Sequence, residues 1–226
     1  MKDINIIDKQ REAYKNKFLK YGATPEGTFQ NDTQTQFLRF ERLIKNIKPY
    51  INGATIHDVG SGACDLHNYL LLNNIEHQYS GTEIVQEMIT YSKNKYPDIQ
   101  IFNHDLVATH SSDKYDFVVL SGTLNIFNKL RYDEWKEYSL NLIRKMFDMA
   151  NKAIVFNFLT TYNTYSSPQL MYLNPCEMLD FCITSLSRFT QIDHGYPLYE
   201  ATISVFKKPF VNEIYHLKEF EKYFAH

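Results

Sequence analysis

Long apolar runs are missing from this sequence. No segment approaches the ~20 consecutive apolar residues that a bilayer-spanning helix requires. The first residues, MKDINIIDKQREAYK, are charged and lack the apolar stretch of a signal peptide. Cysteine is also scarce: the chain has three, an odd number without a disulfide-type spacing, which indicates free thiols in a reducing compartment. We therefore expect a soluble, cytoplasmic protein.

An excess of basic residues is missing as well. Lys and Arg number 24 against 26 Asp and Glu, which gives a formal net charge of −2. A nucleic-acid-binding domain usually carries a clear positive excess to meet the phosphates. We therefore expect a small-molecule substrate, no nucleic-acid or membrane partner, and a monomer or homodimer.

No internal repeat, low-complexity block or linker rich in Pro, Gly and Ser divides the chain. Hydrophobic residues amount to 44% and aromatic residues to 15%, enough for a packed core in one domain of ordinary size. We assign residues 1–34 to an N-terminal aromatic and helical segment that can act as a lid, with a short helix over 11–21. Residues 35–226 form the main domain.

Helices and strands are predicted to alternate along the main domain. Helices are expected over 36–47, 65–72, 85–96, 132–149 and 176–186, the last with Asn174 as its N-cap and Pro175 at its first position. Strands are expected over 54–59, 78–82, 99–103, 115–120, 153–158, 189–193 and 200–206.

This alternation predicts an α/β fold. The expected architecture is a Rossmann-like, doubly wound, seven-stranded and mostly parallel sheet with helices on both faces. Only a short turn separates the last two strands, and such a connection is typical of a hairpin. The last strand should therefore be antiparallel.

A glycine-containing loop, HDVGSGACDL at residues 57–66, follows the first predicted strand. Gly60 and Gly62 allow a close approach of the backbone to a ligand and a positive φ. The helix that follows offers free N–H groups to a negatively charged ligand group. Asp58 can order the loop or accept a hydrogen bond from a ligand ammonium group, and Ser61 lies between the two glycines.

Two further carboxylates follow the next two strands. Glu83 ends the second strand and Asp105 follows the third. A carboxylate at the first place can accept hydrogen bonds from both hydroxyls of an adenosine ribose, and a side chain at the second can reach an adenine amino group. Ligands of doubly wound sheets bind beyond the carboxyl ends of the strands, so the combination predicts an adenosine-containing ligand.

Two such ligands compete, a dinucleotide and S-adenosylmethionine. The dinucleotide fingerprint G-x-G-x-x-G requires a third glycine, where this chain has Asp65. The closing hairpin and the limited room for a substrate domain also favour S-adenosylmethionine. The alternatives are an NAD-dependent oxidoreductase of Rossmann type and a non-catalytic nucleotide-binding protein.

The segments HDVGSGACDL, GTEI, NHDL and YDFVVLSGTLNIF resemble the successive motifs of class I S-adenosylmethionine-dependent methyltransferases, over residues 35–206. The family's first motif is usually D-x-G-x-G-x-G, and Cys64 replaces its last glycine. YGATPEGTFQNDTQTQFLRFERL and DHGYPLYEATISVFK resemble a small bacterial subgroup associated with natural-product and surface-polysaccharide gene sets. The resemblance implies O- or N-methylation of a small molecule such as a sugar, natural product or metabolite.

The resemblance also implies roles for individual residues. The cofactor site would be lined by Asp58, Gly60, Ser61, Gly62, Glu83, Asp105, Leu106 and Ser121. Arg39 and Gln36 are candidate partners of the cofactor's carboxylate, since a guanidinium matches a carboxylate bidentately. Candidate acceptor-binding residues are Asn157, Tyr172, Tyr196 and Glu200. His194 is the candidate general base, because imidazole titrates near neutral pH.

A metal site is not predicted. Cys64 and His67 are three residues apart on a predicted helix, with His57 and His77 nearby, but the chain has no paired C-x-x-C. The N/D-P-P-Y type of motif expected of nucleic-acid amino-methyltransferases is also missing, because the fourth strand ends in SGTL.

Overall fold

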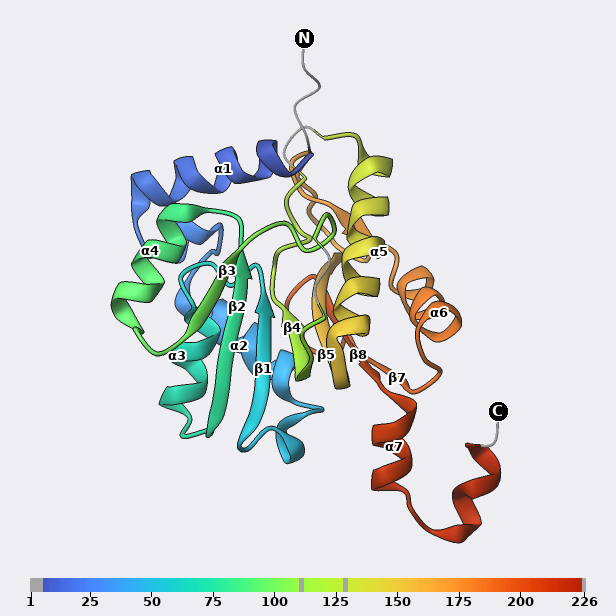
Figure 1. The fold of residues 1–226 in the computed structure, drawn as a ribbon. Helices are drawn as coiled ribbons and strands as arrows, with labels where there is room; N and C mark the ends of the chain where they lie inside the picture. Colours follow the sequence, from blue (N-terminus) through green and yellow to red (C-terminus); the bar gives the residue numbers. More distant parts are fainter. Residues whose placement is uncertain (1–5, 110–111, 128–129, 225–226) are drawn as a thin grey trace.

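The fold is built on one mixed β-sheet. The computed structural model describes residues 6–109, 112–127 and 130–224, and among these the sheet has eight strands in the order β3-β2-β1-β4-β5-β8-β7, with β6 paired to β5 (Figure 1). The strands are β1 (Ala54–Val59), β2 (His77–Glu83), β3 (Gln100–Asn103), β4 (Tyr115–Leu120), β5 (Ala150–Thr160), β6 (Tyr172–Leu173), β7 (Thr190–Asp193) and β8 (Glu200–Phe206). β8 runs antiparallel to β5 and β7, whereas the other pairings are parallel.

Helices cover both faces of the sheet. One face packs against α5 (Tyr132–Met149) and α6 (Pro175–Ser185). The other face packs against α2 (Thr33–Ile44), α3 (Asp65–Leu72), α4 (Gln86–Lys95) and α7 (Lys208–Ile214). The remaining helix, α1 (Ile6–Tyr21), lies across the edge of the sheet toward which β1 and β2 point (Figure 1). The predicted doubly wound α/β architecture with an antiparallel last strand is confirmed.

The central strands are apolar on both sides because helices cover both faces. In β4, Val118 and Leu120 face the α5 side, while Phe117 and Val119 face the α2 side. Helix α5 contributes a buried stripe to the first of these cores, made of Trp135, Leu142, Ile143, Met146 and Met149. This stripe agrees with the helical periodicity seen in the sequence.

The predicted bounds of β1, α3, β4, α5 and β8 coincide with those in the structure. Helix α6 begins as predicted, with the Asn174 side chain accepting hydrogen bonds from the N–H groups of Cys176 and Glu177. Helix α1 begins earlier than predicted, at Ile6, and α2 begins at Thr33, after Asp32 as N-cap.

The predicted count of seven strands was wrong by one, because β6 has only two residues and shows no periodicity. Helix α7 and the 3-10 turns η1 (Glu26–Thr28), η2 (Lys48–Tyr50) and η3 (Lys218–Tyr223) were not predicted either. Within the described ranges, no helix is long and apolar enough to cross a membrane.

Candidate functional site

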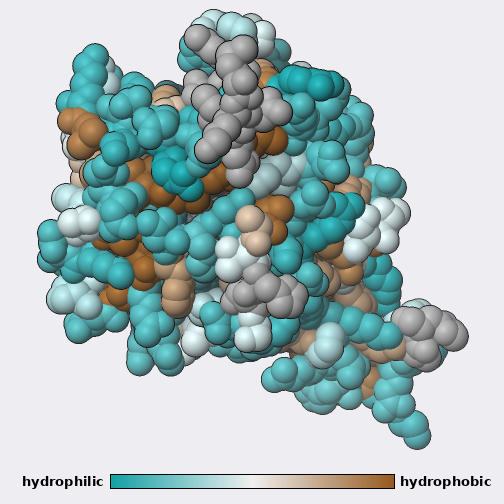
Figure 2. Space-filling view, turned by 45° about the horizontal axis from the view of Figure 1, so that its top comes forward, coloured by the Kyte–Doolittle hydropathy of each residue, from teal (hydrophilic) through white to brown (hydrophobic). Residues whose placement is uncertain are grey.

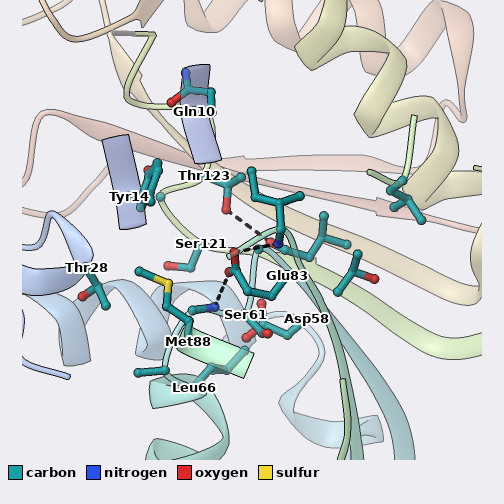
Figure 3. Close-up of a pocket in the computed structure, with 18 of the residues that line it drawn as sticks. Gln10, Tyr14, Thr28, Asp58, Ser61, Leu66, Glu83, Met88, Ser121 and Thr123 are labelled. Atoms are coloured by element: carbon teal, nitrogen blue, oxygen red, sulfur yellow. Dashed lines mark hydrogen bonds between the residues drawn. The ribbon is translucent and has the colours of Figure 1, made fainter. Parts of the chain in front are cut away.

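A pocket opens at the carboxyl edge of the parallel strands, beneath α1 (Figure 3). Residues that follow β1, β2, β3 and β4 line it, together with side chains of α1, α2 and α5. Its empty volume, including the part open to solvent, is about 1030 Å³. Figure 2 brings this edge forward and shows apolar surface recessed between polar side chains.

The loop after β1 has the backbone conformation that its glycines allow. Gly60 and Gly62 have φ of +73° and +54°. A Cβ atom on Gly60 would overlap Thr123 Oγ1 and lie 3.0 Å from Thr123 Cγ2, so the loop needs glycine here for space as well as for φ. Cys64 has a φ of 60° and immediately precedes α3, so it occupies a left-handed position without being glycine.

Asp58, the penultimate residue of β1, lines the pocket. Its Oδ2 accepts a 2.6 Å hydrogen bond from the Tyr79 hydroxyl, and the side chain is almost fully buried. Burial raises the pKa of Asp58 to about 7, although the Tyr79 hydrogen bond acts in the opposite direction. The carboxyl group therefore titrates near neutral pH.

The Glu83 carboxylate is held by backbone N–H groups. Its Oε1 accepts from Ile84 at 2.7 Å and Val85 at 2.9 Å, and its Oε2 accepts from Gly62 at 2.8 Å. Burial raises the pKa of Glu83, while the three N–H donors favour the ionised form. Two carboxylate oxygens offer about four acceptor positions, so a capacity to accept from a ligand remains.

Asp105 and Leu106 line the pocket at the end of β3. Asp105 Oδ1 accepts hydrogen bonds from the N–H of Val107 at 2.9 Å and from the Tyr138 hydroxyl at 2.7 Å. Leu106 is buried beside them. These bonds fix the carboxyl group on the side of the pocket formed by α5.

Two buried hydroxyl groups in the pocket have no hydrogen-bond partner among the described residues. They are Ser61 Oγ, between the two glycines, and Ser121 Oγ, directly after β4. Buried polar atoms are normally paired, so these hydroxyls indicate a polar ligand. The pocket thus brings together Asp58, Gly60, Ser61, Gly62, Glu83, Asp105, Leu106 and Ser121.

Arg39 does not line this pocket, although Gln36 on the same helix does. Arg39 Nε lies 2.7 Å from Glu200 Oε1, and its Nη1 donates to Gln30 Oε1. Glu200 Oε2 accepts from Asn157 Nδ2 at 2.8 Å, and Asn157 Oδ1 accepts from the N–H of Gly122 at 2.8 Å. Arg39 was expected to bind a cofactor carboxylate. It is instead one end of a buried hydrogen-bond network that includes Glu200 and Asn157.

Three other predicted residues also lie outside the pocket. His194 is exposed on the turn between β7 and β8, with Nε2 3.4 Å from Thr160 Oγ1. The Tyr196 hydroxyl pairs with Thr202 Oγ1 at 2.9 Å, and the Tyr172 hydroxyl accepts from a backbone N–H at 3.0 Å. Their polar groups pair with neighbouring parts of the chain, and none of the three residues lines the cavity.

Sequence reasoning missed the pocket residues of α1. Ile7, Gln10 and Tyr14 all line the cavity, and their spacing of three and four places them on one face of the helix. Burial raises the pKa of Tyr14, and the negative charge of Glu83 adds to the effect. The sequence shows this spacing, but it does not show that this face of α1 covers the site.

Other lining residues were not predicted either. They are His104 after β3, Thr123 after β4, and Trp135, Tyr138 and Leu142 on α5. His104 lines the pocket, whereas His194 does not. Over the described parts of the chain, no group of three or more His, Cys, Asp or Glu residues is arranged to hold a metal ion.

The pocket fits an adenosine ligand that carries positive charge. Four carboxyl groups line it (Asp58, Asp65, Glu83 and Asp105), and no Lys or Arg is among its described lining residues. Such a lining favours a cation over an anion. A sulfonium cofactor with an adenosine moiety matches both this charge and the unpaired serine hydroxyls.

Comparison with known proteins places the sequence and the fold. No model of a protein family matches the sequence. The Mycobacterium tuberculosis protein Rv1506c, named as a candidate methyltransferase, is 30% identical over 173 residues, which span 74% of this chain and 98% of the relative.

Two solved structures share the fold. Magnesium protoporphyrin IX methyltransferase from Synechocystis PCC 6803, with bound S-adenosylmethionine, superposes with a TM-score of 0.67 at 11% identity and covers 92% of this chain and 99% of its own. The complex of DhpI with S-adenosylhomocysteine has a TM-score of 0.62 at 13% identity, over 88% of this chain and 95% of its own.

Proposed function

The chain belongs to the S-adenosylmethionine-dependent methyltransferases, and from this premise we propose that it methylates a small-molecule acceptor. The observation that carries the proposal is the buried Glu83 carboxylate, fixed by three N–H groups beside the loop of Gly60 and Gly62. The concave pocket beneath α1 supports a small-molecule acceptor. Magnesium protoporphyrin IX, the acceptor of one enzyme with this fold, is itself a small molecule.

The residues present suit S-adenosylmethionine. We assign Glu83 to a ribose hydroxyl and Asp105 to the adenine amino group, because both carboxylates are anchored by hydrogen bonds to neighbouring groups. The unpaired hydroxyls of Ser61 and Ser121 are assigned to polar atoms of the methionine part. The cofactor supplies an electrophilic methyl group on sulfur.

The chain's own contribution is alignment and exclusion of water. Ile7 and Tyr14 cover the pocket from α1, and Arg11 Nε ties this helix to the Ile84 carbonyl at 3.1 Å. We propose that the segment up to residue 34 acts as a lid over the main domain; its residues 1–5 lie outside the described ranges. Because His194 is exposed and away from the pocket, we do not assign it the role of general base.

Other properties of the chain are consistent with this activity. Cys64, Cys176 and Cys182 are all unpaired, and Cys176 is exposed, which supports a reducing, cytoplasmic location. The acidic pocket supports an acceptor other than nucleic acid, since phosphates would be repelled. We propose that the protein acts as a monomer or homodimer.

Calorimetric titration with S-adenosylhomocysteine tests the cofactor site. The wild-type protein should bind it, and Glu83→Gln should weaken binding by about tenfold, the effect of losing hydrogen bonds to a charged acceptor. Glu87→Gln, which removes a partly exposed ion pair with Lys15 of α1, is the matched control and should bind normally. Binding of NAD but not of S-adenosylhomocysteine would instead favour an oxidoreductase.

A further inference from the structure

The side chain of Gln10 has a fixed orientation in the roof of the pocket. Its Nε2 donates a 2.6 Å hydrogen bond to the Ile126 carbonyl, and the residue is only 2% exposed. Because the amide nitrogen is the donor in this bond, the oxygen is the free end of the amide. Oε1 is buried and has no partner among the described residues, although it belongs to a side chain that lines the cavity.

Gln10 lies away from the groups assigned to the cofactor. Figure 3 shows it at one end of the pocket, with Asp58 and Ser61 toward the other and Thr123 between. Its partner, Ile126, belongs to the segment after β4, and this residue bridges to Leu170 in the loop after β5. Gln10 therefore lies where α1 meets the segment after β4, whose residues Ser121, Gly122 and Thr123 line the cavity.

The charge of the whole cavity lining restricts what can enter it beside the cofactor. The titratable lining residues are Asp58, Asp65, Glu83, Asp105, Tyr14, Tyr138 and His104, with no Lys or Arg among the described ones. Arg39, close by on α2, is already paired with Glu200. The cofactor's own carboxylate is balanced by the ammonium group of the same molecule, whereas an acceptor carrying a carboxylate or phosphate would meet like charges without a cation to bind it.

We propose that Gln10 Oε1 accepts a hydrogen bond from the methyl acceptor, and that the part of the acceptor inside the pocket is an uncharged or cationic hydroxyl- or amine-bearing group, never an anion. This inference rests on the proposed methyl transfer and adds the acceptor's chemical class. A site that offers a buried, fixed hydrogen-bond acceptor discriminates against groups that cannot donate, because its own polar atom is then left unpaired.

The first test uses the wild-type protein and pairs of acceptors that differ in charge. The probes are tyramine against 4-hydroxyphenylacetate and glucosamine against glucose 6-phosphate, with formation of S-adenosylhomocysteine as the readout. We expect methylation of tyramine or glucosamine, with at least about tenfold lower kcat/KM for the anionic member of the pair. Equal or better use of the anionic members overturns the proposal, as does failure of both amines while S-adenosylhomocysteine still binds.

The second test uses Gln10→Met, which keeps the size of the side chain but removes the amide. The KM of the acceptor should rise by about 3- to 10-fold, as expected for one lost hydrogen bond, while the Kd of S-adenosylhomocysteine stays within about twofold. Gln191→Met, an exposed change on β7, is the control and should alter neither. A parallel loss of S-adenosylhomocysteine affinity in Gln10→Met would make Gln10 a cofactor residue and overturn the proposal. Failure of the wild type to bind S-adenosylhomocysteine would instead refute the methyltransferase function itself.

Discussion

Gly60→Ala should lower the free energy of unfolding by about 2–5 kcal/mol. The φ of +73° costs a residue with a Cβ about 1–2 kcal/mol. The new methyl group would also overlap Thr123 Oγ1 and lie 3.0 Å from its Cγ2, and overpacking of this kind costs about 1–3 kcal/mol. The two contributions have separate origins and can be measured separately.

Thr123→Ala separates them. This substitution removes both atoms that the new methyl group meets first and leaves Thr123 Cβ at 3.2 Å. It also removes the 3.2 Å hydrogen bond from Thr123 Oγ1 to the Val59 carbonyl, a loss of about 1 kcal/mol. In the Thr123→Ala background, Gly60→Ala should cost only the φ term, about 1–2 kcal/mol. The coupling between the two changes should therefore be about 1–3 kcal/mol.

Urea unfolding of the wild type, the two single variants and the double variant measures this coupling directly. Additive effects, within about 0.5 kcal/mol, would show that the loop after β1 does not press against Thr123 as described. A cost of Gly60→Ala below about 1 kcal/mol would refute the left-handed conformation as well.

Three further predictions concern the interior. Cys64→Gly should be about 1 kcal/mol more stable than Cys64→Ala in urea unfolding, because alanine retains the strained φ of 60° and glycine relieves it; equal stability would contradict this strain. Burial raises the pKa of Asp58 from 3.8 to about 7, so the folded state binds more protons than the unfolded state between these values, and stability falls as pH rises through this window. Burial lowers the pKa of His57 from 6.5 to about 4, so its contribution has the opposite sign and stability falls as pH drops from 6.5 to 4. The two contributions oppose each other and largely cancel in the wild type between about pH 4 and 6.5, so stability should rise with pH in this window in Asp58→Asn and fall with pH in His57→Gln. The same pH dependence of unfolding in both variants would contradict the assignments. Finally, Arg39→Met should cost about 3–5 kcal/mol by leaving the Glu200 carboxylate buried without its cation, whereas a cost near zero would mean that the pair is not desolvated.

Two kinds of element could be predicted from the sequence. One is a strand that is apolar throughout because helices cover both of its faces, and the other is a helix with one continuous apolar stripe. The sequence YDFVVL of β4 and the stripe of α5 both gave the correct bounds, because burial fixes nearly every apolar position. The two residues of β6 and the seven of α7 are too short for a period to appear. Their positions depend on tertiary pairing, which local sequence does not encode.

Some residues of the site could likewise be predicted from the sequence, and others could not. Gly60, Glu83 and Asp105 were predicted because each lies at or just after the carboxyl end of a strand, and parallel strands bring these ends to one edge. Arg39 was assigned to a ligand because its partner, Glu200, is 161 residues away along the chain. Gln10 was not predicted, because the polarity of a residue does not reveal which face of a helix covers a cavity.

The position of β8 affects how the chain acquires its ligand site during synthesis. All described lining residues, from Ile7 to Leu142, emerge before β8, yet this last strand is inserted between β5 and β7. Glu200 at its start holds Asn157, which in turn holds the Gly122 N–H in the pocket wall. A nascent chain that carries every lining residue therefore still lacks the contact that fixes this wall. Non-local pairings of this kind form late, so we expect the ligand to bind the completed fold and not to guide its assembly on the ribosome.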